Sequence, residues 1–321
     1  MKVSIAMATY NGEKYIQEQL DSFLAQTYLP DELIVTDDCS TDSTEQIVKA
    51  YAETAPFDVV FHRNEKNLGY CGNFNAALMK TTGDLVFLSD QDDVWFPEKM
   101  EFMVRLAEEN PEMLVLMNDT ELTDGELNPV GLTKLGQIKS AGLSLNSYVM
   151  GCCCAVRREL LDLCMPIPEG FRAHDNWLVE FAAGLNAKWV DKTVLQYYRR
   201  HESNESQFIV NRTVKVNRVD VFKERLSKVF EGKLNEAVDI QITQRRLFVD
   251  GVSRALERNP VARVEQINEM LQCTQLEIDC LVKRVDIRRL PLFSRIVGVV
   301  VFFLKGGYGL GAKSIVRDLL G

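Results

Sequence analysis

Short apolar runs alternate with helical patterns over the first ninety residues of the chain. Val3–Ala8, Glu32–Thr36, Val59–His62 and Leu85–Ser89 each have the length and apolar content of a buried strand, and turn-forming residues follow them. Strands that alternate with helices indicate βαβ units and a mostly parallel sheet. We therefore predict an α/β fold, in which a ligand binds beyond the carboxyl ends of the strands.

The middle of the chain continues the mixture of strands and helices with less regular spacing. The same criteria apply to it, namely 3.6-residue periodicity for helices and short apolar runs for strands. They predict helices at Pro97–Asn110, Arg158–Leu163 and Trp177–Gly184, short strands at Met113–Met117, Cys152–Val156, Trp189–Asp191 and Val194–Tyr198, and an exposed glycine-rich loop at Thr123–Ile138.

Strand patterns disappear after about residue 210, and long helical patterns take their place at Asn217–Phe230, Ala237–Leu256 and Val261–Val285. We therefore predict a first domain over residues 1–210 and a helical extension over residues 211–321. The last of these patterns has heptad-like spacing. This spacing suits either a coiled-coil homodimer or a helix that packs on its own domain.

The charge balance of the chain excludes some classes of partner. Its 37 Lys and Arg residues against 46 Asp and Glu residues give a formal charge of -9, whereas a general nucleic-acid-binding protein needs a basic footprint. Residues 283–321 are the exception, since they hold eight Lys or Arg and two Asp. A basic tail on an acidic body indicates either an anionic membrane surface, an acidic partner or a solvated helix face.

The same tail contains the longest apolar run of the chain, Ile296–Leu304, which is far shorter than the roughly 20 residues that span a bilayer. Because basic residues flank this run, we predict an interfacial membrane segment. The alternative is a helix buried against its own domain or a dimer partner. The apolar residues are Phe293, Ile296, Val297, Val299–Leu304 and Tyr308, and the basic ones are Arg288, Arg289, Arg295, Lys305 and Lys313.

The eight cysteines include no CxxC pair, which gives little support to a zinc site or a redox dithiol. The consecutive Cys152, Cys153 and Cys154 lie in an apolar run and are expected to be small buried side chains. A reducing cytosol suits this usage. The N-terminal sequence lacks the long apolar run of a signal peptide, so we expect a cytoplasmic protein.

Three carboxylates follow the fourth predicted strand in the sequence Ser89-Asp90-Gln91-Asp92-Asp93. Such carboxylates repel one another and require a cation or hydrogen-bond donors. Asp-x-Asp spacing suits Mg²⁺ or Mn²⁺, which commonly bridge to substrate phosphates. The alternative is an acidic turn that caps the next helix.

Polar residues also follow the first two strands, and all of them are expected at the same sheet edge as Asp90 and Asp92. Tyr10-Asn11 offers an aromatic stacking face, and a carboxylate of Asp37-Asp38 can accept a hydrogen bond from the imide of uracil or thymine. A helix cap and a half-buried aromatic are the alternatives. Convergence on one edge favours a nucleotide pocket.

Two of the three histidines occur in polar segments later in the chain. His174-Asp175-Asn176-Trp177 opens a predicted helix, where Asp175 is either a cap or a general base for an incoming hydroxyl. The second segment runs from Tyr198-Arg199-Arg200-His201 to Ser203-Asn204. Arg, His and Asn side chains together suit a diphosphate or its metal ion, although a lone His in a polar loop is commonly just solvated.

Taken in order, these motifs resemble the family 2 glycosyltransferases, which are nucleotide-sugar-dependent enzymes of the GT-A fold. The resemblance covers roughly the first 205 residues. Asn73-Phe74 and the segments at His174 and Tyr198 further resemble the bacterial rhamnosyltransferase-like branch that builds surface polysaccharides. The family motifs are Ala6–Gly12, Ile34–Asp42, Asn67-Leu68-Gly69 and Ser89-Asp90-Gln91-Asp92.

The resemblance implies a role for each matching residue. Ala8, Tyr10 and Asp38 would line the pyrimidine pocket, with Thr9 and Asn11 beside them. Asp90 would face the ribose or the sugar. Asp92 would ligate Mg²⁺ or Mn²⁺, with His201 as a supporting ligand, and Asp175 would be the base. Lys66, Asn67 and Asn73 would be neighbours of the donor.

The resemblance also implies a reaction. An inverting enzyme would move a sugar, rhamnose among the candidates, from a dTDP- or UDP-sugar to a saccharide or lipid-linked saccharide, at the inner face of the plasma membrane. Two alternatives remain, a nucleotidyltransferase and a non-catalytic nucleotide-sugar-binding module. The first would need a Gly-rich basic loop near the N-terminus, where this chain has Ala8-Thr9-Tyr10-Asn11-Gly12. The second would not need Asp175.

Overall fold

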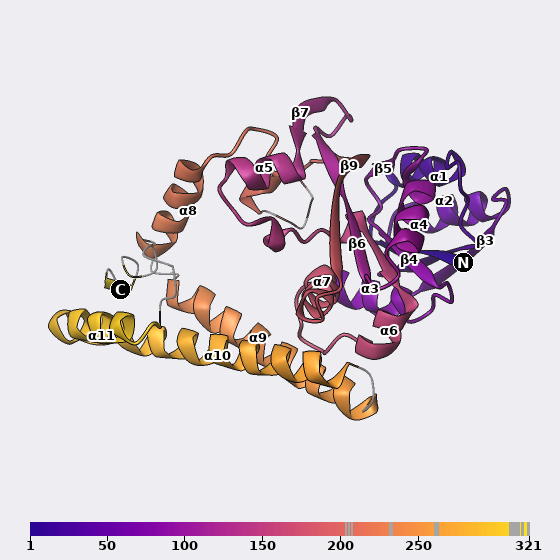
Figure 1. The fold of residues 1–321 in the computed structure, drawn as a ribbon. Helices are drawn as coiled ribbons and strands as arrows, with labels where there is room; N and C mark the ends of the chain where they lie inside the picture. The colour runs from indigo at the N-terminus through magenta and orange to yellow at the C-terminus, as the bar shows by residue number, and fades with distance from the viewer. Residues whose placement is uncertain are drawn as a thin grey trace. The chain divides into compact units, whose positions relative to one another are not determined.

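The computed structural model describes residues 1–202, 204, 206, 208–230, 234–259, 263–307, 315, 318 and 319. The chain divides into two compact units, Met1–Asn217 and Arg218–Gly321, which are drawn in Figure 1. The predicted residues Ser203, Tyr308 and Lys313 lie outside the described part of the chain.

Nine strands of the first unit form one sheet, in the order β3-β2-β1-β4-β8-β6-β9-β5, with β7 beside β6. The first four strands pair in parallel, as do β6 and β9, whereas β8, β7 and β5 are antiparallel to their partners. The predicted α/β fold with a mostly parallel sheet is therefore confirmed. The strands are β1 (Val3–Thr9), β2 (Glu32–Asp37), β3 (Asp58–Arg63), β4 (Leu85–Ser89), β5 (Val94–Trp95), β6 (Val115–Thr123), β7 (Pro129–Thr133), β8 (Cys154–Arg157) and β9 (Lys188–Arg199).

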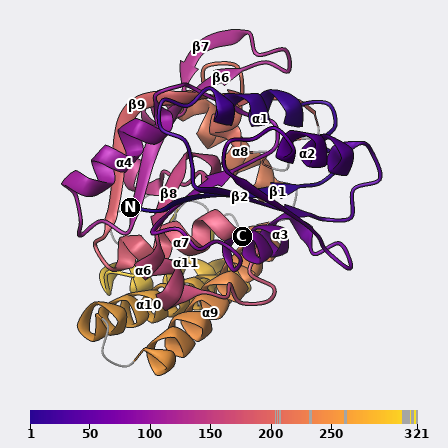
Figure 2. The same cartoon turned by 90° about the vertical axis from the view of Figure 1, so that its right-hand side faces the viewer.

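Helices cover both faces of this sheet, as Figure 2 shows. Alternate residues of β1, such as Ile5 and Met7, share one core cluster with Phe23 of α1, Val48 of α2 and Met100 of α4. Residues between them point to the opposite face, where α3 and α7 lie. The helices of this unit are α1 (Ile16–Leu24), α2 (Thr44–Ala52), α3 (Gly69–Leu78), α4 (Lys99–Glu109), α5 (Lys134–Ser140), α6 (Arg158–Cys164) and α7 (His174–Gly184).

Two predictions for the middle of the chain were wrong. The segment Thr123–Ile138 is not an exposed loop, because it holds β7 and α5, and Leu135 and Ile138 are buried. A helix of seven residues is too short for its periodicity to stand out. The two strands predicted between residues 189 and 198 are one strand, β9, whose register against β6 shifts twice.

The second unit contains four helices in its described part, α8 (Arg218–Phe230), α9 (Leu234–Arg258), α10 (Val264–Arg288) and α11 (Leu292–Leu304). Val238 and Ile242 of α9 pack against Ile278, Leu281 and Val285 of α10. The heptad-like residues of α10 thus pack within this chain.

No helix in the described residues combines the length and the apolar character that crossing a bilayer requires.

Two arginines of the basic tail form ion pairs within the second unit. Arg284 Nε lies 2.7 Å from Asp318 Oδ2, and Arg288 Nε lies 3.3 Å from Asp318 Oδ1. Asp318 and Arg288 are both buried. Arg288, which we expected to flank a membrane segment at the surface, is therefore part of a buried ion pair instead, because the carboxylate of Asp318 compensates its charge.

Candidate active site

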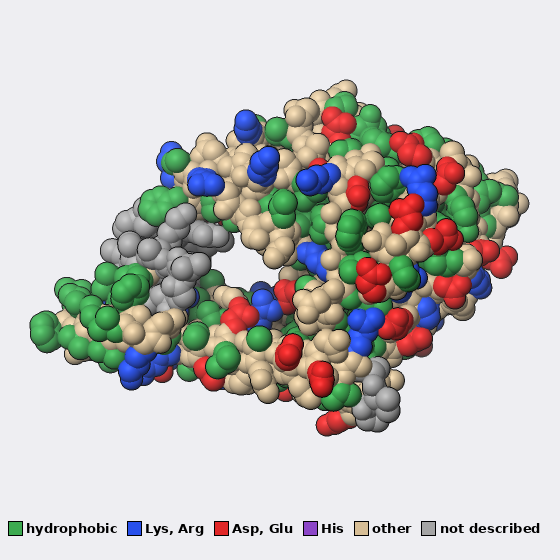
Figure 3. Space-filling view, in the orientation of Figure 1, with side chains coloured by type: hydrophobic (Ala, Val, Ile, Leu, Met, Phe, Trp, Pro, Cys, Tyr) green, Lys and Arg blue, Asp and Glu red, His purple; other side chains and the backbone are tan. Residues whose placement is uncertain are grey.

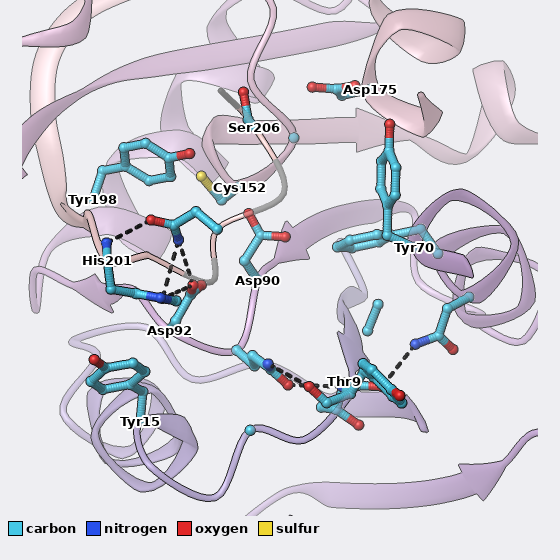
Figure 4. A pocket seen from close by; sticks show the side chains of 18 of the residues that line it. Thr9, Tyr15, Tyr70, Asp90, Asp92, Cys152, Asp175, Tyr198, His201 and Ser206 are labelled. Carbon is cyan, nitrogen blue, oxygen red and sulfur yellow. Dashed lines mark hydrogen bonds and ion pairs between the residues drawn. The ribbon is translucent and has the colours of Figure 1, made fainter. Parts of the chain in front are cut away.

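A cavity of about 1490 Å³ lies at the carboxyl ends of β1, β2 and β4. It reaches from the loop after β1 to the start of α7 (Figure 4). Lys66 is exposed and does not line this cavity. All the other residues that we predicted for the site line it, namely Ala8, Thr9, Tyr10, Asn11, Asp38, Asn67, Asn73, Asp90, Asp92, Asp175 and His201.

One end of the cavity is built around Asp38, which is buried. Its Oδ1 accepts hydrogen bonds from the backbone N–H of Leu68 at 2.7 Å and from Asn64 Nδ2 at 3.0 Å. Asn67 donates to the Asp38 carbonyl, and Asn73 donates to the carbonyl of Thr9. The two asparagines therefore hold the loops around Asp38, and Asp38 lines the cavity.

Asp37, which the sequence placed beside Asp38 as an equal candidate, has a different role. Its side chain is fully buried and accepts hydrogen bonds from the Ser40 backbone at 2.9 Å and from Thr9 Oγ1 at 3.0 Å. Arg63 lies 3.4 Å from its second oxygen. Asp37 thus shapes the loop after β2, and only Asp38 faces the cavity.

Gln91, the middle residue of the Asp-x-Asp motif, joins two loops of the cavity. Its amide makes two hydrogen bonds of 2.9 Å with the backbone of Tyr10, one as acceptor and one as donor. Gly12 leaves room for this contact, since a Cβ there would lie 2.4 Å from Gln91 Oε1. The loop after β4 and the loop after β1 therefore hold each other in place.

The centre of the cavity contains a cluster of oxygen and nitrogen donors. Asp92 Oδ2 lies 2.8 Å from His201 Nε2 and 3.0 Å from Asn204 Nδ2, and the dashed lines in Figure 4 mark both contacts. The His201 ring packs on Tyr15, with ring centroids 4.8 Å apart. The amide oxygen of Asn204 accepts from the His201 backbone N–H, so a carboxylate oxygen and an imidazole nitrogen are the groups here that Mn²⁺ or Mg²⁺ could accept as ligands.

Two further carboxylates, Asp90 and Asp93, lie close to Asp92 in the chain. Asp93 is buried and accepts from Gln196 Nε2 at 3.1 Å and from the Arg199 backbone at 3.2 Å. Burial, together with the neighbouring charges of Asp92 and Asp93, raises the pKa of Asp90 well above its usual range. A divalent cation would offset this repulsion, so the residues present suit one.

Asp175 lies at the other side of the cavity from Thr9. Figure 4 shows Asp90 and Asp92 between Thr9 on one side and Asp175 with Ser206 on the other. The N-cap of α7 is Ala173, which makes no side-chain cap hydrogen bond, and Asp175 Oδ1 accepts the backbone N–H of its neighbour Asn176 at 2.8 Å. The alternative that Asp175 serves as the helix cap is therefore wrong.

His174, beside Asp175, is packed into the wall. Its ring stacks on Phe74 with centroids 3.8 Å apart, and burial lowers its pKa to about 4. The imidazole is therefore neutral near pH 7, and it adds no positive charge next to the Asp175 carboxylate.

Tyr70, Gln91, Lys134 and Asn211 are among the lining residues that sequence analysis missed. Tyr70 directly follows the Asn67-Leu68-Gly69 motif, and Gln91 lies inside the Asp-x-Asp motif, so both were within reach of a motif argument. Lys134 was hidden in the segment that we expected to be a loop. Asn211 lies in a 3₁₀ turn, Ile209–Asn211, which has no periodicity to reveal it.

Comparison with known proteins gives one family and several relatives. Residues 4–163 match the model of Glycosyl transferase family 2. An uncharacterized glycosyltransferase of Nostoc sp. is 29% identical over 215 residues, which cover 64% of this chain and 66% of that protein. The dTDP-rhamnosyl transferase RfbG of Shigella flexneri is 24% identical over 245 residues, 68% of this chain and 80% of that protein. This chain thus spans slightly less than two thirds of the Nostoc relative.

A solved structure shows the same fold. TarS of Staphylococcus aureus, in a fragment crystallised with UDP, superposes with a TM-score of 0.54 at 21% identity, over 99% of this chain and 89% of that one. At this identity the similarity establishes the arrangement of helices and strands.

Proposed function

Because residues 4–163 place this chain in glycosyl transferase family 2, and its fold is the GT-A fold, we propose that it transfers a sugar from a nucleotide-diphosphate sugar to a hydroxyl group of a saccharide or lipid-linked saccharide. The observation that carries the proposal is one continuous cavity that joins Asp38, Asp92 and Asp175. A donor along it would lay its base near Asp38, its diphosphate near Asp92 and its sugar toward Asp175.

A pyrimidine base suits the Asp38 end of the cavity. Asp38 Oδ2 can accept a hydrogen bond from the imide N–H of uracil or thymine, and the half-exposed ring of Tyr10 offers a stacking face. The names of the relatives point the same way, since RfbG is a dTDP-rhamnosyl transferase and TarS was crystallised with UDP. We therefore take dTDP-rhamnose and UDP-sugars as the first donors to test.

Asp92 and His201 would hold Mg²⁺ or Mn²⁺, with the Asn204 amide beside them. When bound, the ion supplies positive charge that stabilises the diphosphate leaving group. Arg199 orients this side of the site, since its guanidinium donates to the Asp92 carbonyl at 2.9 Å and to the Gly125 carbonyl at 2.8 Å.

Asp175 would act as the general base of an inverting displacement. Its carboxylate takes the proton of the acceptor hydroxyl while that oxygen attacks the anomeric carbon, and the nucleoside diphosphate leaves from the opposite face. The acceptor hydroxyl becomes acidic only as the new bond forms, so a carboxylate is a sufficient base. The side of the cavity that holds Asp175 is therefore the acceptor side.

A thermal-shift panel tests the proposed function. We expect dTDP- or UDP-sugars with Mn²⁺ to raise the melting temperature and GDP-sugars to have a smaller effect, because a ligand at about 100 times its Kd stabilises the fold by about 2.7 kcal/mol. EDTA should reverse the shift. Binding without release of nucleoside diphosphate would favour a non-catalytic binding module, and the absence of any shift would contradict the proposal.

The Gln91 contact gives a second test, through the Gln91→Met variant. Methionine keeps the length of the side chain and removes both hydrogen bonds to Tyr10, at a cost of about 1–2 kcal/mol in the ordering of the two loops. We expect roughly tenfold weaker UDP binding in the presence of Mn²⁺, measured by calorimetry. Gln17→Met, at an exposed position of α1, is the control. Unchanged affinity in Gln91→Met would show that the two loops are ordered without the contact.

We also propose that α11 attaches the protein to a membrane surface, in agreement with a lipid-linked acceptor and with a cytoplasmic location at the inner face of the plasma membrane. Val299 is the buried residue of this helix, whereas Phe293 is 80% and Leu304 77% exposed. Figure 3 shows hydrophobic side chains gathered over α11. Lys305 and Arg289 lie exposed at its two ends, where anionic lipid headgroups would meet them.

Vesicle flotation tests this attachment. We expect binding to vesicles that contain phosphatidylglycerol, weaker binding to pure phosphatidylcholine, and an at least tenfold loss in the Phe293→Ser, Leu304→Ser double variant, because each side chain contributes about 1.5–3 kcal/mol when buried. Leu276→Ser removes an equally apolar side chain, 64% exposed, from α10 and should bind as the wild type. Equal flotation of all three proteins would contradict membrane attachment through α11.

A further inference from the structure

We propose that Lys134 and Arg200 form an anion-binding subsite on the acceptor side of the cavity, and that the acceptor therefore carries a phosphate or carboxylate group close to the hydroxyl that reacts. This inference rests on the proposed function, since it names the chemical class of acceptor that the same site would take.

Lys134 is a buried cation on the cavity wall. Its side chain is 3% exposed and lines the cavity. The ammonium group donates to Asn211 Oδ1 and lies 5.4 Å from the centroid of the Phe208 ring. Among the described residues it has no carboxylate within ion-pair distance. Burial lowers the pKa of Lys134 to about 8, so the charged form still predominates at pH 7, and a buried charge of this kind calls for a counter-ion.

Arg200 brings a second positive charge to the same region. It lines the cavity, and its guanidinium donates to the Ser206 carbonyl at 3.0 Å and to the Tyr198 hydroxyl at 3.3 Å. No salt bridge joins it to a carboxylate in the part of the chain that the structure describes. Its charge contributes to the lowered pKa of Lys134. Because the two charges repel each other, an anion bound to both would stabilise them.

The subsite lies apart from the place of the donor diphosphate. Arg199 and His201 turn toward Tyr15, at 4.4 Å and 4.8 Å from its ring, and so face the Asp92 side. Arg200, which lies between them in the chain, instead donates to the Tyr198 hydroxyl and to the Ser206 carbonyl. Figure 4 shows Ser206 on the same side of Asp90 as Asp175. An anion between Lys134 and Arg200 therefore belongs to the molecule that Asp175 activates.

The side chains around the two cations suit a phosphate or a carboxylate. The planar guanidinium of Arg200 can bind two oxygens of either group at once. Asn211 Nδ2 donates to Ser206 Oγ at 2.7 Å, which holds the Ser206 hydroxyl at the edge of the subsite. A glycosyl phosphate or diphosphate and an acidic saccharide present the same oxygen geometry, and the experiment below separates them.

The test uses the full chain saturated with UDP and Mn²⁺ and compares three probes by ligand-observed NMR, methyl glucoside, methyl glucuronide and glucose 1-phosphate. We expect at least tenfold tighter binding of one or both anionic probes than of the neutral one, and the preferred probe identifies phosphate or carboxylate. Lys134→Met should abolish the preference and Lys134→Arg should retain it. Lys139→Met, at an exposed position of the same helix, should match the wild type.

Two results would overturn the inference. One is equal affinity for the neutral and anionic probes in the wild type, and the other is a more than tenfold loss of UDP affinity in Lys134→Met, which would assign the cation to the donor. If Lys134→Met does not fold, the same comparison in Arg200→Gln decides. Failure of the wild type to bind UDP at all would instead overturn the proposed function, whereas UDP binding without a preference for anions overturns this inference alone.

Discussion

Replacing Asp175 with asparagine is expected to lower sugar transfer by roughly 10²–10⁴-fold, the usual contribution of a positioned general base, while the affinity for the donor changes little. Asparagine has the same shape but cannot take a proton. The carboxylate lies across Asp90 and Asp92 from Thr9, where the nucleotide is proposed to bind, so its loss should spare the contacts with the nucleotide. Release of nucleoside diphosphate measures the reaction, and calorimetry measures donor binding.

A matched control removes a carboxylate that plays no part in the reaction. Asp162 on α6 is exposed and lies outside the cavity, so Asp162→Asn should keep wild-type turnover. Wild-type turnover by Asp175→Asn would remove Asp175 from the role of base.

The second large effect is expected in Asp92→Ala, which should lose most of its metal-dependent affinity for the nucleotide. Outer-shell changes at metal sites typically cost 10–100-fold, and the loss of a direct ligand should cost at least as much. The reason is the position of Asp92, whose Oδ2 is shared by His201 Nε2 and Asn204 Nδ2. Titration of UDP into protein with Mn²⁺ and with EDTA measures the difference.

Wild-type protein in EDTA should bind UDP as weakly as Asp92→Ala does in Mn²⁺, and adding EDTA to the variant should change little further. His201→Ala should show a smaller loss, because Asp92 would still hold the ion. An Asp92→Ala variant whose UDP affinity stays at the wild-type value and still depends on Mn²⁺ would exclude Asp92 as the metal ligand.

The sequence predicted best those helices and strands whose own periodicity identifies them. β1 to β4 and their helices have clear periodicity, and parallel strands bring their carboxyl ends to one edge without further information. This is why the sequence alone could place Asp38, Asp90 and Asp92 at one edge of the sheet. The sequence could not tell which of Asp37 and Asp38 faces the cavity. That depends on the contacts that Ser40, Thr9 and Arg63 make with Asp37 in the folded chain.

Long-range pairing accounts for most of what was missed. β6 lies between β8 and β9, which follow it by tens of residues, so its full length was not apparent from Met113–Met117. The same holds for Lys134, whose hydrogen-bond partner Asn211 lies far along the chain. The basic tail was predicted as one uniform surface, but the partner of Arg288 is Asp318, thirty residues further on.

The hydrogen bonds between Gln91 and Tyr10 make the loop after β1 and the loop after β4 one thermodynamic unit. A ligand that orders either loop reduces the entropy that a ligand of the other must lose, so each binds more tightly when the other is present. Linkage requires the factor to be equal in both directions. Cation and donor would consequently be captured and released together, and the nucleoside diphosphate that remains after transfer would leave faster wherever the cation is scarce.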